Sequence, residues 1–193
     1  MKKKHRLLPV LGIGGCLLIL AALLASHLLT QWANRTNVSV VAQLERSLPE
    51  KSSGSSEDYS DATMPIRQIG GEDYVCLLEV PSMGITLPVS ERWRFDTLLV
   101  HPARFWGSVY DGSCILGGSS REGQFDFCAR LEMDDEIRIT DMQGACFTFR
   151  IARIDRSKSV AFDVLADEKY PLTLFVRDQY DFGYILVRCD WAY

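Results

Sequence analysis

The sequence predicts an all-β domain, either a barrel or a sandwich, carried behind an N-terminal membrane-spanning helix. Two observations predict this architecture. The first 30 residues contain a long apolar segment, and residues 74–193 consist of short strand-like runs separated by turn signals. Composition agrees with one globular domain, because 47% of the 193 residues are hydrophobic and 24% are charged.

Residues 7–30 form the apolar segment, 24 residues without Asp, Glu, Lys or Arg. At about 1.5 Å per residue, a helix of this length crosses the roughly 30 Å hydrocarbon core of a bilayer. The basic residues lie in the preceding segment 1–6, so the positive-inside rule places the N-terminus in the cytoplasm and the rest of the chain outside. A cleaved signal peptide is the alternative, because small residues between Ala21 and Ser26 resemble a cleavage region.

Charge is unevenly distributed along the chain. The first six residues carry four basic side chains, which leaves 17 basic against 25 acidic residues and a net charge of −8 in the remainder. Nucleic-acid binding requires a basic face. We therefore expect no nucleic-acid partner.

Residues 31–72 are expected to form an extracytoplasmic helix followed by a Ser/Gly/acidic linker. The apolar pattern of residues 37–48 predicts a short amphipathic helix that leaves the membrane. The Ser-, Gly- and acid-rich stretch that follows has no apolar period and is typical of a flexible spacer. Asn34 and Asn37 match the glycosylation acceptor pattern, which matters only in a glycosylating secretory pathway.

The folded domain is expected over residues 73–193, with alternating strands and two short helices. Ile137 and Ile139 should share one face of their strand, and Phe147, Phe149 and Ile151 should face the core. The expected strands are 74–80, 85–89, 113–116, 136–140, 146–154, 172–176 and 184–189. The expected helices are 92–98 and 162–167.

The cysteines predict neither a disulfide framework nor a metal site. Outside the membrane segment they are odd in number and lack zinc-like spacing. We expect buried thiols that act as small hydrophobic side chains, and no cofactor. The five residues are Cys76, Cys114, Cys128, Cys146 and Cys189.

Three further features have both a functional and a structural interpretation. The acidic run 132–136 has the ligand type that calcium prefers, although a solvated polar turn is favoured. His101 is interpreted as a solvated or capping residue. An aromatic set either lines a binding groove or packs on the barrel, namely Trp93, Phe95, Phe105, Trp106 and Tyr110.

Four segments carry a resemblance to a known family. They are LLEVPSMGITLPV (77–89), SCILGG (113–118), FDFCARLEMDDEIRITDMQGACFTFRI (125–151) and LTLFVRDQYDFGYILVRC (172–189). In this order and spacing, behind an N-terminal anchor, they resemble the sortases, membrane-anchored cysteine transpeptidases of mainly Gram-positive bacteria. The resemblance implies an eight-stranded β-barrel with short helices. It also implies cleavage at a sorting signal and transfer of the acyl-enzyme to an amine.

The family's reaction requires a Cys nucleophile, a His that serves as acid and base, and an Arg that binds the developing oxyanion. Carried over by position, the His falls on Gly118, the Cys on Arg177 and the Arg on Tyr184. The Thr that precedes the family's Cys is Val176. The resemblance therefore implies a degenerate member with no catalytic residue at these positions.

The resulting hypothesis is a single-pass, surface-exposed pseudosortase. It would bind a sorting-signal peptide or a pilin, or scaffold an active sortase, with the Arg177 guanidinium holding a carbonyl or carboxylate. The alternative is a divergent cysteine transpeptidase or hydrolase that uses Cys114, Cys128 or Cys189 with His101. A relic gene product without selected function is the third possibility.

Overall fold

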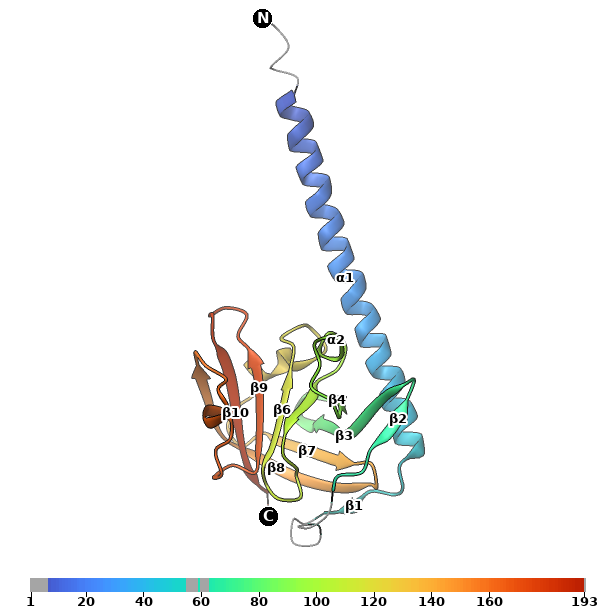
Figure 1. The fold of residues 1–193 in the computed structure, drawn as a ribbon, viewed down its shortest axis with the longest axis vertical. Coiled ribbons are helices and arrows are strands. Elements are labelled where there is room, and N and C mark those ends of the chain that lie inside the picture. The colour runs from blue at the N-terminus through green and yellow to red at the C-terminus, as the bar shows by residue number, and fades with distance from the viewer. Residues whose placement is uncertain (1–6, 55–58, 60–62, 193) are drawn as a thin grey trace, which may run out of the picture.

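The computed structural model describes residues 7–54, 59 and 63–192, with side chains from residue 15 onward. A long helix projects from a β-barrel (Figure 1). The strands are β1 (Ser52–Ser53), β2 (Arg67–Ile69), β3 (Glu72–Val80), β4 (Ile85–Ser90), β5 (Ala103–Trp106), β6 (Cys114–Gly118), β7 (Glu136–Asp141), β8 (Ala145–Ser157), β9 (Leu172–Arg177) and β10 (Tyr184–Trp191). The helices are α1 (Leu7–Ser47), α2 (Phe95–Leu98) and α3 (Phe162–Leu165), with 3-10 turns η3 (Pro81–Met83) and η4 (Phe125–Ala129).

Eight strands close the barrel in the order β3-β4-β5-β6-β9-β10-β8-β7, and β7 pairs with β3 to complete the ring. The pairs β4–β5 and β6–β9 are parallel, and the other pairs in the ring are antiparallel. Closure removes the open edges that an isolated sheet would expose. The expected eight-stranded barrel is confirmed.

Alternation along the strands defines the barrel core. Ile137 and Ile139 of β7 are fully buried, as are Phe147 and Phe149 of β8, while Ile151 is 1% exposed. These are the core-facing positions that the alternating sequence pattern predicts. The inward side of β9 and β10 follows the same rule and contributes Leu172, Leu174, Val176, Ile185, Val187 and Cys189.

Three strands are absent from the sequence prediction. β5 is four residues long and follows a His-Pro pair, so the sequence offers no alternating run to detect. β1 and β2 lie in the expected spacer, where β1 pairs with β8 and β2 forms a hairpin with β3. Residues 55–58 and 60–62 of that spacer lie outside the described residues.

Helix α1 is one continuous helix of 41 residues, where the sequence pattern predicted a membrane segment and a separate amphipathic helix. It is long and apolar enough to cross a membrane, and a signal sequence has the same property. Its projecting part exposes large apolar side chains that no protein segment covers. Leu17, Leu18, Ile19, Leu20, Leu23, Leu24, Leu28 and Leu29 are 54–74% exposed.

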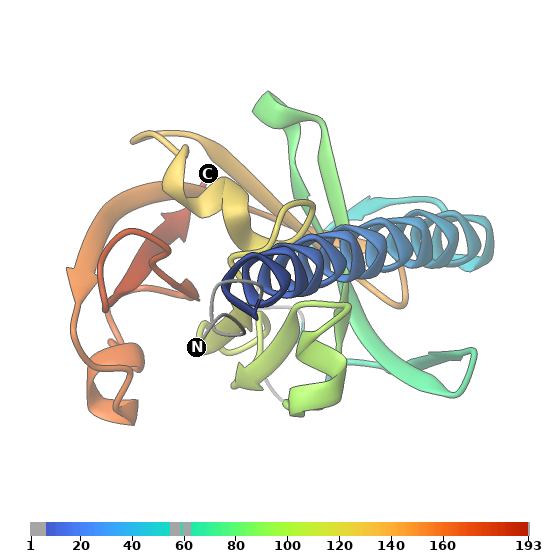
Figure 2. The same cartoon turned by 90° about the horizontal axis from the view of Figure 1, so that it is seen from above.

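The C-terminal half of α1 docks on the outside of the barrel. Ala33, Asn37, Val40 and Leu44 are buried and recur at helical spacing on one face of α1. Val40 and Leu44 pack with residues of β3 and with Met142, which follows β7. Figure 2, viewed from above, shows α1 running across one side of the domain.

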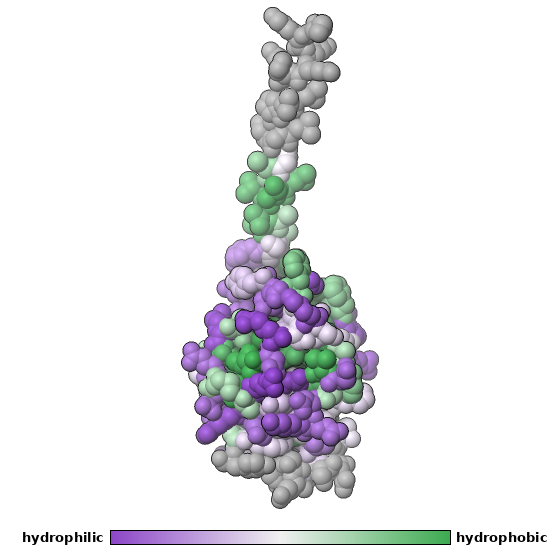
Figure 3. All heavy atoms as spheres, turned by 90° about the vertical axis from the view of Figure 1, so that its left-hand side faces the viewer, coloured by the Kyte–Doolittle hydropathy of each residue, from purple (hydrophilic) through white to green (hydrophobic). Residues whose placement is uncertain are grey.

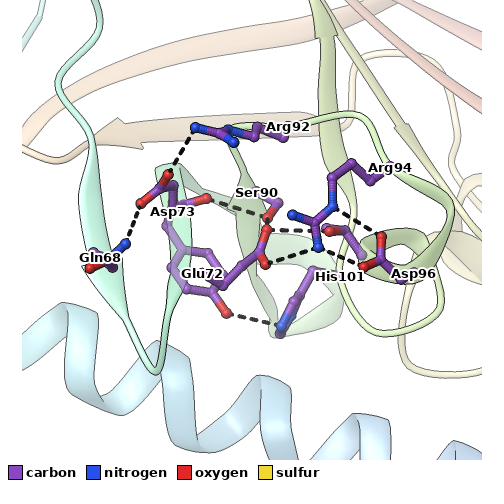
Figure 4. A network of polar contacts seen from close by, with 10 residues as sticks. Gln68, Glu72, Asp73, Ser90, Arg92, Arg94, Asp96 and His101 are labelled. Atoms are coloured by element: carbon purple, nitrogen blue, oxygen red, sulfur yellow. Dashed lines mark hydrogen bonds and ion pairs between the residues drawn. The ribbon is translucent and has the colours of Figure 1, made fainter.

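His101 is buried between α1 and β3, so its interpretation as a solvated or capping residue was wrong. Asn37 Nδ2 donates to the Val100 carbonyl at 3.1 Å, so Asn37 Oδ1 accepts from His101 Nδ1 at 2.7 Å. The Tyr74 hydroxyl donates to His101 Nε2 at 2.9 Å (Figure 4). Burial lowers the pKa of His101 to about 4, and the ring is neutral at pH 7. Asn37 is also buried, which excludes it as a glycosylation acceptor in this fold.

A second polar cluster holds the loop that contains α2 (Figure 4). Glu72 accepts hydrogen bonds from Ser90 Oγ at 2.7 Å and from Thr97 Oγ1 at 3.2 Å. Arg94 pairs with Asp96 at 2.6 Å and lies 3.9 Å from Glu72. These contacts connect the α2 loop to β3 and β4.

We predict that acid weakens the folded chain through His101. Its folded pKa of about 4 lies below the ordinary value of 6.5, so the folded state binds fewer protons between these values. The contribution of His101 to the free energy of unfolding should be fully present above pH 6.5. The free energy of unfolding should then fall by up to about 3 kcal/mol as the pH approaches 4. Chemical unfolding of the full chain in detergent at several pH values measures this slope.

Two variants test whether His101 is the source of that slope. His101→Gln should flatten it, whereas His27→Gln on the exposed part of α1 should leave it unchanged. An equally steep slope in His101→Gln would show that other groups cause it.

Candidate functional site

The three positions that the resemblance assigns to catalysis lie on neighbouring strand ends. Gly118, the last residue of β6, pairs with Val176 of β9. Arg177, the last residue of β9, pairs with Tyr184, the first residue of β10. The barrel therefore brings these positions together at one edge, although they are up to 66 residues apart in the chain.

Gly118 faces the barrel interior. A Cβ added at Gly118 would lie 2.6 Å from the ring of Phe125, which is fully buried in the core cluster. A Cβ added at Gly117 would instead collide with Trp93 and lie 2.5 Å from Phe175. The two glycines thus face opposite sides of the sheet, and each is already covered by an aromatic ring.

Arg177 lies on the outer side of the sheet. Val176 is part of the barrel core, and Arg177 is exposed on the other face, which it shares with Phe175. Continuing the alternation of β6 by one residue places Ser119, the residue after Gly118, on this outer face. The resemblance assigns Gly118, whereas alternation continued past the end of β6 favours Ser119 as the neighbour of Arg177. Ser120, the next residue, lines the pocket beside Arg177.

A pocket of about 390 Å³ opens beside Arg177. The connection from β9 to β10 forms one wall, and the segment from Ser120 to Arg130, which includes η4, forms another. A smaller pocket of about 200 Å³ continues along the β9–β10 connection to Phe182. Together the two pockets have room for a ligand of a few residues.

Most charged groups at the pocket are already paired. Asp178 accepts from the Tyr180 backbone N–H at 2.9 Å and from Arg156 Nε at 3.2 Å, and these bonds hold the pKa of Asp178 below its usual value. Arg130 pairs with Asp126 at 3.1 Å. Arg177 has no ion-pair partner in the described part of the chain. Its guanidinium is therefore free to bind an anion or a carbonyl. Glu122, which lines the same pocket, also has no ion-pair partner in the described part of the chain.

No model of a known protein family matches the chain, and no curated protein matches it. Solved structures do match it. Sortase C1 from Streptococcus agalactiae has a TM-score of 0.54 at 18% identity over 72% of this chain and 75% of that chain. Sortase C-1 from Actinomyces oris has a TM-score of 0.53 at 19% identity over 62% of this chain and 74% of that chain. A pilus-related sortase C of Group B Streptococcus has a TM-score of 0.52 at 15% identity over 70% and 77%.

The domain has a sortase-like fold. The structural matches and the closed eight-stranded ring support this together. At this level of identity the likeness concerns the fold, and function has to be argued from the residues present.

The aromatic set of the sortase-like domain is divided between packing and exposure. Trp93 packs with Phe105 and Phe175 at centroid distances of 5.2 and 5.3 Å on the outer face of the barrel. Tyr110 is buried in the core, whereas Phe95 and Trp106 are exposed. Trp93 thus covers the outer surface of β6 and β9 at Gly117.

Helix α3 covers the next part of the same outer face. Leu165 of α3 packs with Ile115, Phe175 and Leu186. Arg188, which is buried, donates to the Leu165 carbonyl at 2.6 Å and also to the Val164 carbonyl. This guanidinium holds the end of α3 against the sheet. A second pocket of about 470 Å³ opens beside α3, and its lining includes Ile115, Leu165 and Thr173.

The cysteines outside the membrane segment are mostly buried, as the sequence predicted. Cys76, Cys114, Cys128 and Cys189 are buried, and Cys146 is partly buried. Burial raises the pKa of Cys114 to about 12 and raises those of Cys76, Cys128 and Cys189 as well. These four thiols are therefore protonated near neutral pH and are poor nucleophiles.

The acidic run 132–136 forms the turn that leads into β7, whose first residue is Glu136. Asp135 Oδ2 accepts from the Glu132 backbone N–H at 2.9 Å, and Glu136 pairs with Arg138 at 2.5 Å. Within the described residues, no group of three or more His, Cys, Asp or Glu side chains is arranged to hold a metal ion.

We predict that a thiol introduced by Arg177→Cys responds to a histidine at Ser119 and not to one at Gly118. Ser119→His should lower the thiol pKa, because a neighbouring imidazolium stabilises a thiolate. Gly118→His should leave the thiol pKa unchanged and reduce stability, because its side chain collides with Phe125. The pH dependence of alkylation measures the thiol pKa. Cys16→Ser and Cys146→Ser are included in every variant, so that the remaining native thiols are buried and react slowly.

The reverse pattern, in which only Gly118→His lowers the thiol pKa, would favour the register read from the sequence. A thiol that responds to neither histidine would show that these strand ends are not neighbours.

Proposed function

We propose that this chain is a membrane-anchored, catalytically inactive sortase-like protein that binds a peptide at the pocket beside Arg177. The observation that carries the proposal is the set of residues at the three converging strand ends. Gly118, Arg177 and Tyr184 stand there, with Ser119 next to Gly118. None of these side chains supplies a thiolate or an imidazole, so acyl transfer of the sortase type lacks both its nucleophile and its base.

The alternative, a relocated Cys and His, is less well supported. His101 is the histidine nearest in sequence to these strands. Both of its ring nitrogens already have hydrogen-bond partners, Asn37 and Tyr74. Its lowered pKa makes it a weak base. The candidate thiols Cys114, Cys128 and Cys189 are buried in the core with raised pKa values. A catalytic pair requires an accessible thiolate within hydrogen-bond reach of its base.

The ligand class follows from the chemistry of the pocket. An unpaired guanidinium forms charge-assisted hydrogen bonds with a peptide carbonyl or carboxylate. A sorting-signal peptide or a pilin segment offers such groups in an extended conformation, and retention without cleavage would make the chain an accessory to an active sortase. Scaffolding of an active sortase through another surface is the second form of this role.

The membrane topology is part of the same proposal. Helix α1 would anchor the chain with residues 1–6 in the cytoplasm and the barrel outside. The exposed leucines of its projecting part support a bilayer as their surroundings.

We predict that Arg177→Gln weakens binding of a synthetic sorting-signal peptide about tenfold, which corresponds to the loss of about 1.4 kcal/mol from a charge-assisted hydrogen bond. Fluorescence anisotropy with the full chain in detergent measures the affinity. Arg153→Gln is the matched control, because Arg153 is an exposed arginine on β8 that pairs with Asp155 away from the pocket. Equal losses in both variants would exclude the Arg177 pocket as the binding site.

We also predict that neither the native chain nor Arg177→Gln cleaves this peptide, because no thioester can form at position 177. Mass spectrometry of the incubated peptide detects cleavage. Turnover that disappears when Cys114, Cys128 or Cys189 is replaced would favour the divergent enzyme.

For topology, protease added to intact protoplasts should remove the barrel and leave the N-terminal segment, because residues 31–193 would lie outside. Immunoblotting with tags at each end of the chain distinguishes the fragments. A barrel protected until the membrane is permeabilised would reverse the orientation.

A further inference from the structure

One edge of the barrel faces along α1 toward the N-terminus (Figures 1 and 2). It is formed by residues 93–99, 119–124 and 178–183, which we call the rim. Gln124 Nε2 donates to the Leu98 carbonyl at 3.2 Å, which connects the first two segments.

The third rim segment and α1 belong to the same connected edge. Gln179 donates to the Ser120 carbonyl, so the β9–β10 connection is bonded to the middle segment. On the other side, Asn34 of α1 lies against Gly123, where an added Cβ would collide with its amide. The rim is therefore held at the level of Asn34 on α1.

This level lies next to the end of the apolar segment. Thr30, its last residue, precedes Asn34 by four residues, which is about 6 Å along a helix. Because α1 is continuous through this region and docked below it, the distance between the rim and the apolar segment is fixed. Figure 1 also shows α1 leaning over the barrel, so that the rim lies beneath its projecting part.

The rim carries aromatic side chains that the protein leaves uncovered. Tyr180 and Phe182 in the β9–β10 connection are 94% and 91% exposed, and Phe95 at the start of α2 is 80% exposed. Figure 3 shows apolar surface at the upper margin of the domain beside the helix. Exposed aromatic residues grouped at one edge indicate a contact surface.

Two ion pairs neutralise charges at the rim. Arg94 pairs with Asp96 at 2.6 Å, and Lys158, which follows β8, pairs with Asp181 at 2.6 Å. Arg121 and Glu122 in the middle segment have opposite charges. Aromatic side chains with neutralised neighbours suit the headgroup region of a bilayer, where an apolar ring enters and a polar edge stays hydrated.

We propose that the rim rests on the membrane that α1 crosses, with Phe95, Tyr180 and Phe182 in the headgroup region. This inference rests on the proposed membrane anchor. A bilayer is favoured over a protein partner because α1 would deliver the bilayer surface to within about one helical turn of the rim.

The test uses the full chain in phosphatidylcholine vesicles, with one environment-sensitive fluorophore on an introduced cysteine. Phe182→Cys and Phe95→Cys place the fluorophore on the rim. Trp106→Cys is the control, because Trp106 is also exposed but pairs with Ile115, away from the rim end of β6. Cys16→Ser and Cys146→Ser remove the two native thiols that are not fully buried.

At the rim positions we expect blue-shifted emission, quenching by nitroxide-bearing lipid and protection from iodide in the buffer. The Trp106→Cys fluorophore should show the opposite quenching pattern. Vesicles that carry the protein on flotation while the rim fluorophores stay open to iodide would overturn the rim contact and leave the anchor intact. Rim fluorophores protected from both quenchers would show that protein covers the rim, which also overturns the proposal. A chain that fails to float with the vesicles would overturn the anchor and the rim contact together.

Discussion

The docking of α1 on the barrel is the interaction on which the rest of the molecule depends. It combines an apolar stripe, centred on Val40 and Leu44, with the hydrogen-bonded series Asn37, His101 and Tyr74. Apolar contacts are non-directional, so the stripe alone specifies the position of the helix along its axis only loosely. The polar series specifies it closely, since a shift would leave a buried imidazole and a buried hydroxyl without partners, which costs about 1–3 kcal/mol for each group. The position of α1 relative to the barrel is therefore specified, and a rigid helix leads from the apolar segment into the fold.

Strand pairing then determines what lies at the edge next to the apolar segment. The parallel pairing of β6 with β9 sends the ends of both strands to the same edge, and β10 begins there. The Arg177 pocket and the exposed aromatic residues of the β9–β10 connection thus share one edge of the barrel. If that edge lies against a bilayer, a bound peptide must present its segment close to the membrane surface. A ligand whose recognised segment is short and close to the membrane satisfies this constraint better than a ligand whose recognised segment lies in the middle of a large extracellular domain.

Much of the barrel could be predicted from the sequence because closure buries one face of every strand, and burial leaves an alternating pattern. Phe147 and Phe149 are examples. The missed parts depend on partners distant in the chain. β1 forms because β10 ends opposite Phe149 and leaves the first residues of β8 unpaired on that side, and His101 is buried because Asn37, 64 residues earlier, bonds to it. The motif also could not predict which face of β6 Gly118 occupies, because a pair of glycines has no side chains that would indicate the alternation. The buried Cys114 and Leu116 on the same strand carried the only sequence signal for it.

The two glycines at the end of β6 show how the packing around this strand end limits which residues can stand there. Phe125 covers Gly118 from inside the barrel, and Trp93 covers Gly117 from outside, so neither position has room for a Cβ. A histidine at Gly118 would have to displace a fully buried phenylalanine, and a residue larger than glycine at Gly117 would have to displace the cluster of Trp93 and Phe175. Aromatic rings and α3 cover part of the outer face of β6 and β9 as well. The pocket beside Arg177 opens at the strand ends next to these glycines, so a ligand that binds there meets a charged side chain and hydrogen-bonding groups.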